Sequence, residues 1–427
     1  MDAADTPPND DQPGGYVNSG RAPSRLVTLR PAPFGADPTG DRLDRILRSP
    51  NYRDGAFVNP VAARAASGGG LLRTLPEAMR KEARRARRPV RPVPLHPRTL
   101  TDLAEPPASG LRLTWTGHSS VLAEIGGRRV LFDPVWGERC SPLLFLGPRR
   151  VHPAPVPVAS LTGLDVVVIS HDHYDHLDMP AILALIRSEA VFAVPLGVGA
   201  HLEHWGVPPE RLRELDWHET TEVAGLTLTA TPARHFCGRG LRGRQQTLWA
   251  SWVVTDGLHT VFHSGDTGYF PGFAEIGERH GPFDATMIQI GAYSQSWPDG
   301  HADCPPGEPC DCVPDPGPWP DVHMTPDEGV RAHLDLQGGA PRGVLLPIHW
   351  GTFNLALHPW AEPGERTLLA DHRAGQVSAT PRVGEPFEPA DPPPPYPWWR
   401  EVAVTPPQGW APWPPVSPAR DEQPAEA

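Results

Sequence analysis

Lysine and cysteine are scarce in this chain, and acidic residues outnumber basic ones. Lys81 is the only lysine among 427 residues, and 38 basic residues against 50 acidic ones leave a formal net charge of −12. This balance argues against a general nucleic-acid binder, because such proteins neutralise phosphates with clustered basic side chains. The five cysteines are an odd number without regular spacing, which favours a reducing compartment over a disulfide-stapled fold.

Long apolar runs are also missing from the sequence. No stretch approaches the about 20 apolar residues that a membrane-spanning helix needs. The first 20 residues are acidic and polar, and they lack the apolar segment of a signal peptide. We therefore expect a cytoplasmic protein.

Proline is abundant, and its 57 copies concentrate in the first 110 and the last 50 residues. We expect four parts: a disordered tail at 1–25, an N-terminal extension at 26–108, a folded domain at 109–370 and a Pro-rich extension at 371–427. The N-terminal extension includes a predicted helix, Leu71–Arg88, whose polar face is strongly basic. Such a face is most simply solvated, and the alternative is contact with anionic headgroups or a substrate phosphate.

Short β-type runs separated by turn residues begin at Leu111. The runs at 111–116, 121–125 and 129–132 predict a β-meander, after which strands alternate with helices. Thr325-Pro326-Asp327-Glu328 is typical of a helix start, with proline in the first turn and acids near the positive end of the helix dipole. We expect an α/β (α+β) fold, an αββα sandwich of two mixed sheets with helices on the outer faces.

The stretch from His171 to His176 has the pattern His-x-His-x-Asp-His and directly follows the apolar run 166–169. The two-residue step places His171 and His173 on one side of an extended or turning backbone, and Asp175 and His176 reach a neighbouring position. Four potential ligands in this short stretch are more than one four-coordinate zinc with an open site can use. The pattern therefore predicts two adjacent metals.

Three further residues of metal-binding type end predicted strands that are far apart in the sequence: His235, Asp266 and His349. Each one alone is most simply a residue that hydrogen-bonds to a loop. Their recurrence beside the first cluster instead favours one shared metal site, which the fold has to assemble.

Several motifs surround these candidate ligands. They include Thr116-Gly117-His118-Ser119, Trp249-Ala250-Ser251-Trp252, Ser264-Gly265-Asp266-Thr267 and His349-Trp350-Gly351-Thr352. With them the chain resembles the metallo-β-lactamase-fold hydrolases, over roughly residues 110 to 365. Within that superfamily it is most similar to the branch of N-acyl-phosphatidylethanolamine-hydrolysing phospholipase D.

The resemblance implies that seven residues hold two Zn²⁺ ions, with Fe or Mn as alternatives. The first ion would be held by His171, His173 and His235. The second would be held by Asp175, His176 and His349, and Asp266 would bridge the two ions. Two dications about 3.5 to 4 Å apart share a water and lower its pKa towards neutrality, so that a metal-bridging hydroxide is the nucleophile. Catalytic roles are implied for Asp175, Asp266 and His323.

His323 matches a histidine that the branch also has before this helix. It would contact the phosphate or protonate the leaving group, and capping of the helix is the alternative role. Tyr293 is a weaker candidate for a contact with the substrate.

Four polar residues close to the candidate ligands have supporting roles in our interpretation. Asp172 and Asp178 do not fit the ligand pattern, so we expect them to orient the histidines or to cap the helix that starts near Met179. His118 and Asp133 lie at the ends of strands in the opening meander, where we expect them to support the ligands or to brace loops.

One insertion departs from the branch, because it lies where a much shorter link to the last helix is expected. Its residues of metal-binding type include His301, Cys304, Cys310 and Cys312. They could bind a further metal, but Cys-x-Cys without a second pair is a weak zinc signal, and a flexible loop is favoured.

These observations predict a metal-dependent hydrolase, a phospholipase D-type phosphodiesterase that acts on N-acyl-phosphatidylethanolamine or a related phosphodiester. A lactonase or other ester hydrolase is the alternative, since the ligands alone do not distinguish phosphorus from acyl carbon. An alternative of another class is a non-catalytic membrane-surface or nucleic-acid binding module that uses the basic helix. The expected partners are a small-molecule or lipid phosphodiester substrate and, through peripheral contact, an anionic membrane at the inner membrane surface. Nucleic acid is not expected, and the oligomeric state stays open.

Overall fold

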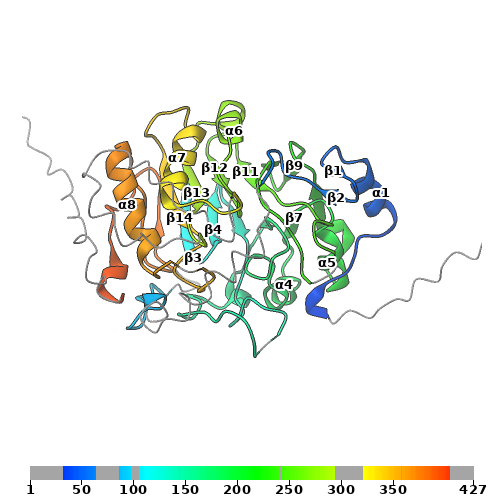
Figure 1. Ribbon diagram of the computed structural model, residues 1–427, viewed down its shortest axis with the longest axis horizontal. Coiled ribbons are helices and arrows are strands. Elements are labelled where there is room, and N and C mark those ends of the chain that lie inside the picture. Colours follow the sequence, from blue (N-terminus) through cyan, green and yellow to red (C-terminus); the bar gives the residue numbers. More distant parts are fainter. Residues whose placement is uncertain are drawn as a thin grey trace, which may run out of the picture.

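The apolar runs form two β-sheets that pack face to face (Figure 1). The computed structural model describes residues 32–63, 86–97, 105–143, 145–240, 243–293, 321–356 and 358–403. The first sheet has the strand order β15-β3-β4-β5-β6-β7-β8. Its strands are Leu111–Gly117 (β3), Ser120–Ile125 (β4), Arg128–Phe132 (β5), Val166–Val168 (β6), Val191–Pro195 (β7), Leu212–Leu215 (β8) and Pro386–Phe387 (β15).

The second sheet has the strand order β14-β13-β12-β11-β10-β9. Its strands are Thr220–Val223 (β9), Leu226–Thr231 (β10), Ser251–Thr255 (β11), Thr260–His263 (β12), Ala285–Gln289 (β13) and Val344–Ile348 (β14). Each sheet begins as an antiparallel meander and continues with parallel strands, from β5 in the first sheet and from β12 in the second. Parallel strands share a direction, so their carboxyl ends lie at one edge of each sheet.

Helices cover the outer face of each sheet, and Figure 1 shows α6, α7 and α8 grouped together. The helices are Gly40–Arg48 (α1), Met179–Leu185 (α4), Gly199–His204 (α5), Gly272–His280 (α6), Pro326–Leu336 (α7) and Glu362–Ala374 (α8). Ile182 of α4 and Leu202 of α5 pack with Phe192 of the first sheet. Phe273 of α6 and Leu336 of α7 pack with the second sheet. The predicted αββα sandwich is confirmed.

Smaller elements complete the described part of the chain. They are the hairpin Tyr52–Arg53 (β1) and Ala56–Phe57 (β2), and the 3-10 helices Ala32–Phe34 (η1), Val158–Ser160 (η2), Pro209–Arg211 (η3) and Trp398–Glu401 (η5). The segment before the main domain docks on α5, because Trp205 donates from Nε1 to the carbonyl of Ala32 over 2.7 Å. After the domain, β15 pairs with β3, and Trp398 and Trp399 are fully buried.

Local chemistry explains the boundaries that the sequence predicted well. The three strands of the predicted meander are β3, β4 and β5, each within two residues of the expected limits. Helix α7 starts with a capping box, in which Thr325 accepts from the backbone N–H of Glu328 and the Glu328 side chain accepts from Thr325. Asp178 caps α4 by accepting from Ala181, which is one of the two roles expected for it.

Helices α6 and α8 were not predicted. Both include glycine in their first turn, and α8 also includes proline there, which disfavours a helix in the isolated sequence. Packing reverses this preference in α8: a Cβ at Gly364 would lie 2.8 Å from the ring of Trp399, so glycine is what allows the helix to approach the buried tryptophans.

Three predictions lie outside the described residues. They are the tail at 1–25, the insertion with His301 and Cys304 to Cys312, and the basic helix Leu71–Arg88 apart from its last three residues. Within the described residues, no helix is long and apolar enough to cross a membrane.

Candidate metal centre

The predicted ligands lie in loops that follow strands of both sheets. His171, His173, Asp175 and His176 follow β6 of the first sheet. His235, Asp266 and His349 follow β10, β12 and β14 of the second sheet, in this order. These strands end at the same edge of the sandwich, and the structure brings all seven side chains together there.

The first group contains His171, His173, His235 and Asp266. The Nδ1 atom of His173 lies 2.8 Å from Nε2 of His171 and 3.2 Å from Nε2 of His235. Oδ2 of Asp266 lies 3.9 Å from Nε2 of His171 and 3.8 Å from Nε2 of His235. Four potential donor atoms therefore surround one point.

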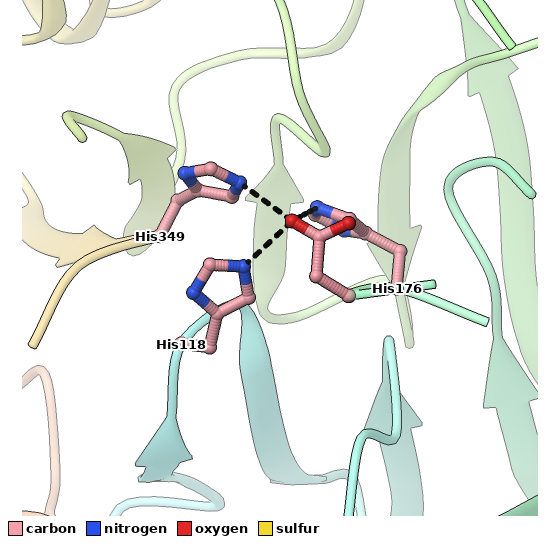
Figure 2. A group of neighbouring side chains, drawn as sticks. His118, His176 and His349 are labelled. Atoms are coloured by element: carbon pink, nitrogen blue, oxygen red, sulfur yellow. Dashed lines mark hydrogen bonds and ion pairs between the residues drawn. The ribbon is translucent and has the colours of Figure 1, made fainter. Parts of the chain in front are cut away.

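The second group contains Asp175, His176 and His349, together with His118, and Figure 2 shows its three imidazoles turned toward one another. Oδ2 of Asp175 lies 3.8 Å from Nε2 of His176 and 3.4 Å from Nε2 of His349. Oδ2 of Asp266 lies 3.2 Å and 3.1 Å from the same two nitrogens. One oxygen of Asp266 thus faces both groups.

The spacing of these atoms fits metal ions. A tetrahedral ion with bonds of about 2.0 to 2.1 Å holds its ligand atoms roughly 3.3 Å apart, and the described separations run from 2.8 to 3.9 Å. The buried Nε2 atoms of His176 and His349 have no hydrogen-bond partner. Buried polar atoms are normally satisfied, so this convergence of unpartnered nitrogens is suited to binding a cation.

The opposite ring nitrogens are held by the fold, which leaves the converging nitrogens free to coordinate. His176 donates from Nδ1 to Oδ2 of Asp133 over 2.7 Å, and His235 donates from Nδ1 to the carbonyl of Val322 over 2.9 Å. Nδ1 of His171 lies 2.9 Å from the hydroxyl of Ser170. Such bonds select the tautomer and orient the ring of a metal-binding histidine.

The pKa values of the histidines differ between the two groups. Burial lowers the pKa of His171 and of His235 well below the usual range, so these imidazoles are neutral and keep a free lone pair. Burial alone would also lower the pKa of His176, but Asp266, Asp175 and Asp133 outweigh it and raise the pKa well above its usual range. Negative charge therefore accumulates around the second group, where a cation can replace the proton.

His118 also belongs to this site, and the sequence did not predict its contact with Asp175. Its Nε2 donates to Oδ2 of Asp175 over 3.1 Å, and burial lowers its pKa to about 3, so the ring is neutral. Its backbone φ is +53°, in the left-handed region, and His349 has a φ of +65°. Left-handed non-glycine residues often mark functional sites, and the Gly117-His118-Ser119 turn between two strands was the available signal.

Asp133 and Asp172 both support the ligand loop. Asp133 accepts from the backbone N–H of Ser170 over 2.7 Å in addition to its bond with His176, so it orients the ligand loop as expected. Asp172 instead accepts from the backbone N–H of Gly238 over 2.7 Å and lies 3.3 Å from Nε2 of His201. Its carboxylate therefore ties the ligand loop to neighbouring segments, and within the described ranges it forms no hydrogen bond with a candidate ligand side chain.

The two predicted substrate contacts differ in their surroundings. His323 lies at the centre, where its buried Nδ1 is 3.9 Å from Oδ2 of Asp266 and has no hydrogen-bond partner. The hydroxyl of Tyr293 donates to Oε1 of Glu362 over 2.9 Å, and the Tyr293 ring stacks on His358 with centroids 4.4 Å apart. Tyr293 is therefore held by the protein itself.

Comparison with known proteins agrees with this geometry. The family model described as the beta-lactamase superfamily domain matches residues 128–350, which contain all seven candidate ligands. The chain belongs to the metallo-β-lactamase superfamily. It is a metal-dependent hydrolase of that superfamily, and its clusters of buried histidine and aspartate are suited to a divalent cation.

Several individual proteins are similar to this chain. An uncharacterised protein of Mycobacterium tuberculosis is 46% identical over 88% of this chain and 94% of its own length. An N-acyl-phosphatidylethanolamine-hydrolysing phospholipase D of Caenorhabditis elegans is 35% identical over 61% of this chain and 69% of its own length. A solved metallo-hydrolase of Ignicoccus hospitalis is 22% identical over 65% of this chain and 98% of its own, with a TM-score of 0.43.

Proposed function

We propose that this hydrolase uses two zinc ions, with Asp266 as their shared ligand. The observation that carries the proposal is the position of Asp266 Oδ2, which lies between 3.1 and 3.9 Å from nitrogens of both groups. His171, His173 and His235 would hold one ion, and Asp175, His176 and His349 the other. When bound, the two ions supply an activated water and stabilise the charge that develops on the substrate.

The substrate that we propose is N-acyl-phosphatidylethanolamine or a related phosphodiester, cleaved in the manner of a phospholipase D. Two dications would carry four positive charges, of which Asp175 and Asp266 neutralise two, because the remaining ligands are histidines. An anionic phosphodiester is attracted to this excess, whereas a neutral ester gains less from it. The 35% identity to the Caenorhabditis elegans phospholipase D supports the same substrate class.

Residues of the chain position the substrate and water in this proposal. His323 is within 3.9 Å of Oδ2 of Asp266 and has an unpartnered Nδ1, so it can contact a phosphoryl oxygen or the leaving group. Asp175 and Asp266 orient the attacking water. His118 holds the Asp175 carboxylate through its 3.1 Å hydrogen bond. Tyr293 has a supporting role in this proposal, because Glu362 accepts from its hydroxyl and its ring stacks on His358.

Metal analysis and a substrate panel test the proposal together. Purified full-length protein should contain about two zinc ions per chain by elemental mass spectrometry, and a chelator should abolish turnover until zinc is restored. The panel should contain N-acyl-phosphatidylethanolamine, other phosphodiesters and lactones, with His173→Ala as the inactive control. Fewer than one metal per chain would overturn the metal assignment. Faster turnover of lactones than of phosphodiesters would overturn the substrate, in favour of the lactonase alternative.

We also place the protein in the cytoplasm, with peripheral contact at the inner membrane surface. The cysteine content supports this, because an odd number of cysteines without regular spacing favours a reducing compartment. Fractionation of the native host should find the protein in the soluble fraction and, at low salt, on membranes. Recovery from the culture medium alone would contradict this location.

A further inference from the structure

A large groove beside the metal centre is lined by arginines. Its volume is about 1110 Å³, and its charged lining residues are Arg88, Arg91, Arg139, Arg149, Arg150 and Glu138. Five positive charges against one negative charge stand out in a chain whose net charge is −12. We call this surface the arginine groove. A concave surface of one sign concentrates ligands of the opposite sign.

The arginines of the groove fall into two kinds. Arg139 donates to the carbonyl of Gly147 over 2.6 Å and Arg150 to that of Val135 over 2.7 Å, so these two shape the groove. Arg149 pairs with the exposed Glu138 over 2.5 Å. Arg88 and Arg91 are exposed and form no ion pair with other residues of the described ranges. Their guanidinium groups are therefore available to an anionic partner, and so is much of Arg149.

Exposed apolar side chains lie in the lining of the same groove or next to it in the chain. Phe145 is 79% exposed and Leu146 61%, and they directly precede Gly147 and Pro148 of the groove lining. Val90, itself a lining residue, is 50% exposed. Single exposed apolar residues are common. Here four of the ten large exposed apolar side chains of the described residues, counting Leu143, line the groove or precede Gly147 of its lining by no more than four positions, and such a concentration favours an interaction surface.

The groove adjoins the metal centre. Asn354 lines both the groove and a smaller pocket that His349 also lines. Phe353 connects the two regions, because its ring lies under the guanidinium of Arg150 at 5.5 Å and against the ring of His118 at 5.3 Å. The backbone N–H of Val151 donates to the carbonyl of Thr352 over 3.0 Å. The groove floor and the end of β14 are thus one packed unit.

We propose that the arginine groove and its exposed apolar side chains dock on the surface of an anionic phospholipid bilayer. Phe145 and Leu146 enter the boundary between headgroups and acyl chains, and Arg88, Arg91 and Arg149 bind lipid phosphates. Membrane proteins use the same combination of apolar insertion and arginine at the headgroup level. Delivery of a lipid phosphodiester along the groove to the metals rests on the proposed function, whereas docking itself does not.

Vesicle binding tests the docking surface. The full-length protein should co-sediment with vesicles of phosphatidylcholine and phosphatidylglycerol but weakly with phosphatidylcholine alone, and added salt should release it. The double variant Arg88→Glu with Arg91→Glu should weaken this binding at least about 25-fold, because each lost positive charge weakens it about fivefold. Phe145→Ser with Leu146→Ser should weaken it about tenfold. Metal content and thermal unfolding establish that each variant is folded.

Matched controls lie far from the groove. Arg48→Glu changes an exposed arginine of α1, and Leu258→Ser changes a side chain that is 88% exposed at the β11–β12 turn. Both controls should bind vesicles like the parent protein. Equal binding to the two kinds of vesicle, or groove variants that bind like the parent, would overturn the proposal. Tighter binding to single-stranded RNA than to anionic vesicles would overturn it in favour of a nucleic-acid surface.

Turnover separates this proposal from the proposed function. The ratio of turnover on vesicle-borne substrate to turnover on a water-soluble short-chain phosphodiester should fall in both groove variants. Loss of vesicle binding with an unchanged ratio would show that docking does not deliver substrate, which overturns the delivery step. If the parent protein hydrolyses neither phosphodiester, the proposed function fails, while the vesicle-binding result still decides the docking surface.

Discussion

The two sheets contribute to the metal centre in different ways. The first sheet supplies four of the candidate ligands from one loop after β6, and it orients this loop with the Asp133 side chain. The second sheet supplies single ligands from three separate loops, and one of them, His235, is oriented by the backbone carbonyl of Val322. A short local motif and a set of residues dispersed over more than a hundred positions thus build one site. The comparison shows that the first half of the site is local, whereas the second half exists only when the sheet is folded.

Asp266 belongs to the dispersed half but faces both groups, so Asp266→Ala should have the largest effect. Loss of the shared oxygen should reduce turnover at least about 1000-fold and lower the zinc content to one ion per chain or fewer. Elemental analysis and steady-state kinetics measure both. Glu278→Gln, at an exposed position of α6, is the control and should keep two ions. Retention of both ions by Asp266→Ala would show that each of the two groups binds its metal without the shared oxygen.

The two sheets meet closely at Gly265, whose φ is +55°. A Cβ there would lie 2.6 Å from Cβ of Ser170 and 3.0 Å from the carbonyl oxygen of Ala250, so Gly265→Ala should destabilise the fold by about 2 to 4 kcal/mol. Gly257→Ala is the matched control, because Gly257 has a φ of +90° and no neighbouring atom within 4 Å. It should cost only the backbone strain, about 1 kcal/mol. Equal losses in chemical denaturation would mean that the contact between the halves adds nothing.

Asp133 tests the orientation of the local half. Asp133→Asn replaces the carboxylate that accepts from Nδ1 of His176, and we expect a loss of about 10- to 100-fold in zinc affinity. Competition with a coloured chelator measures this loss. Asp165→Asn, just before the same strand β6, should leave the affinity unchanged. Unchanged affinity in Asp133→Asn would show that the loop is oriented by its backbone, as His235 is.

Among the candidate ligands, His118 contacts those of the second group, through its hydrogen bond to Asp175 and through its ring, which lies 4.1 Å from that of His349 between centroids. His118→Phe keeps a ring at this position but removes the donor, and we expect the affinity for one ion to fall about tenfold while the other is unaffected. A two-step zinc titration should therefore separate into one unchanged and one weakened step. If both steps weaken equally, His118 acts on the whole loop rather than on Asp175.

The outer layer of the second sheet gives the smallest expected effect. Burial raises the pKa of Asp371 on α8 to about 7, and its Oδ1 has no hydrogen-bond partner. The folded state then binds a proton that the unfolded state has released, so the stabilisation is complete below the ordinary pKa of 3.8 and is lost as pH rises through about 7. Between about pH 6 and about pH 8 the free energy of unfolding should fall by about 1 kcal/mol. Asp371→Asn should remove this part of the pH dependence in urea denaturation.

The local features were predictable because they depend on neighbouring residues. The meander, the capped start of α7 and the ligand cluster after β6 each follow from turn residues, a capping box or a two-residue step. Helix α8 was missed because Gly364 is unfavourable in a helix and acceptable only against the buried Trp399. Likewise, the contact between His118 and Asp175 joins residues 57 positions apart and depends on a left-handed backbone at His118.

The sequence by itself determined the sandwich class, the superfamily and the identity of the candidate ligands. Strand periodicity and ligand motifs can be recognised because each depends on residues that are close together in the sequence. Only the tertiary structure decided that one oxygen of Asp266 faces both groups, that the Tyr293 hydroxyl is occupied by Glu362, and that arginines from residues 88 to 150 line one groove. These facts depend on distances between side chains that are far apart along the chain. Such distances are set by how two sheets pack, and packing is a property of the whole fold.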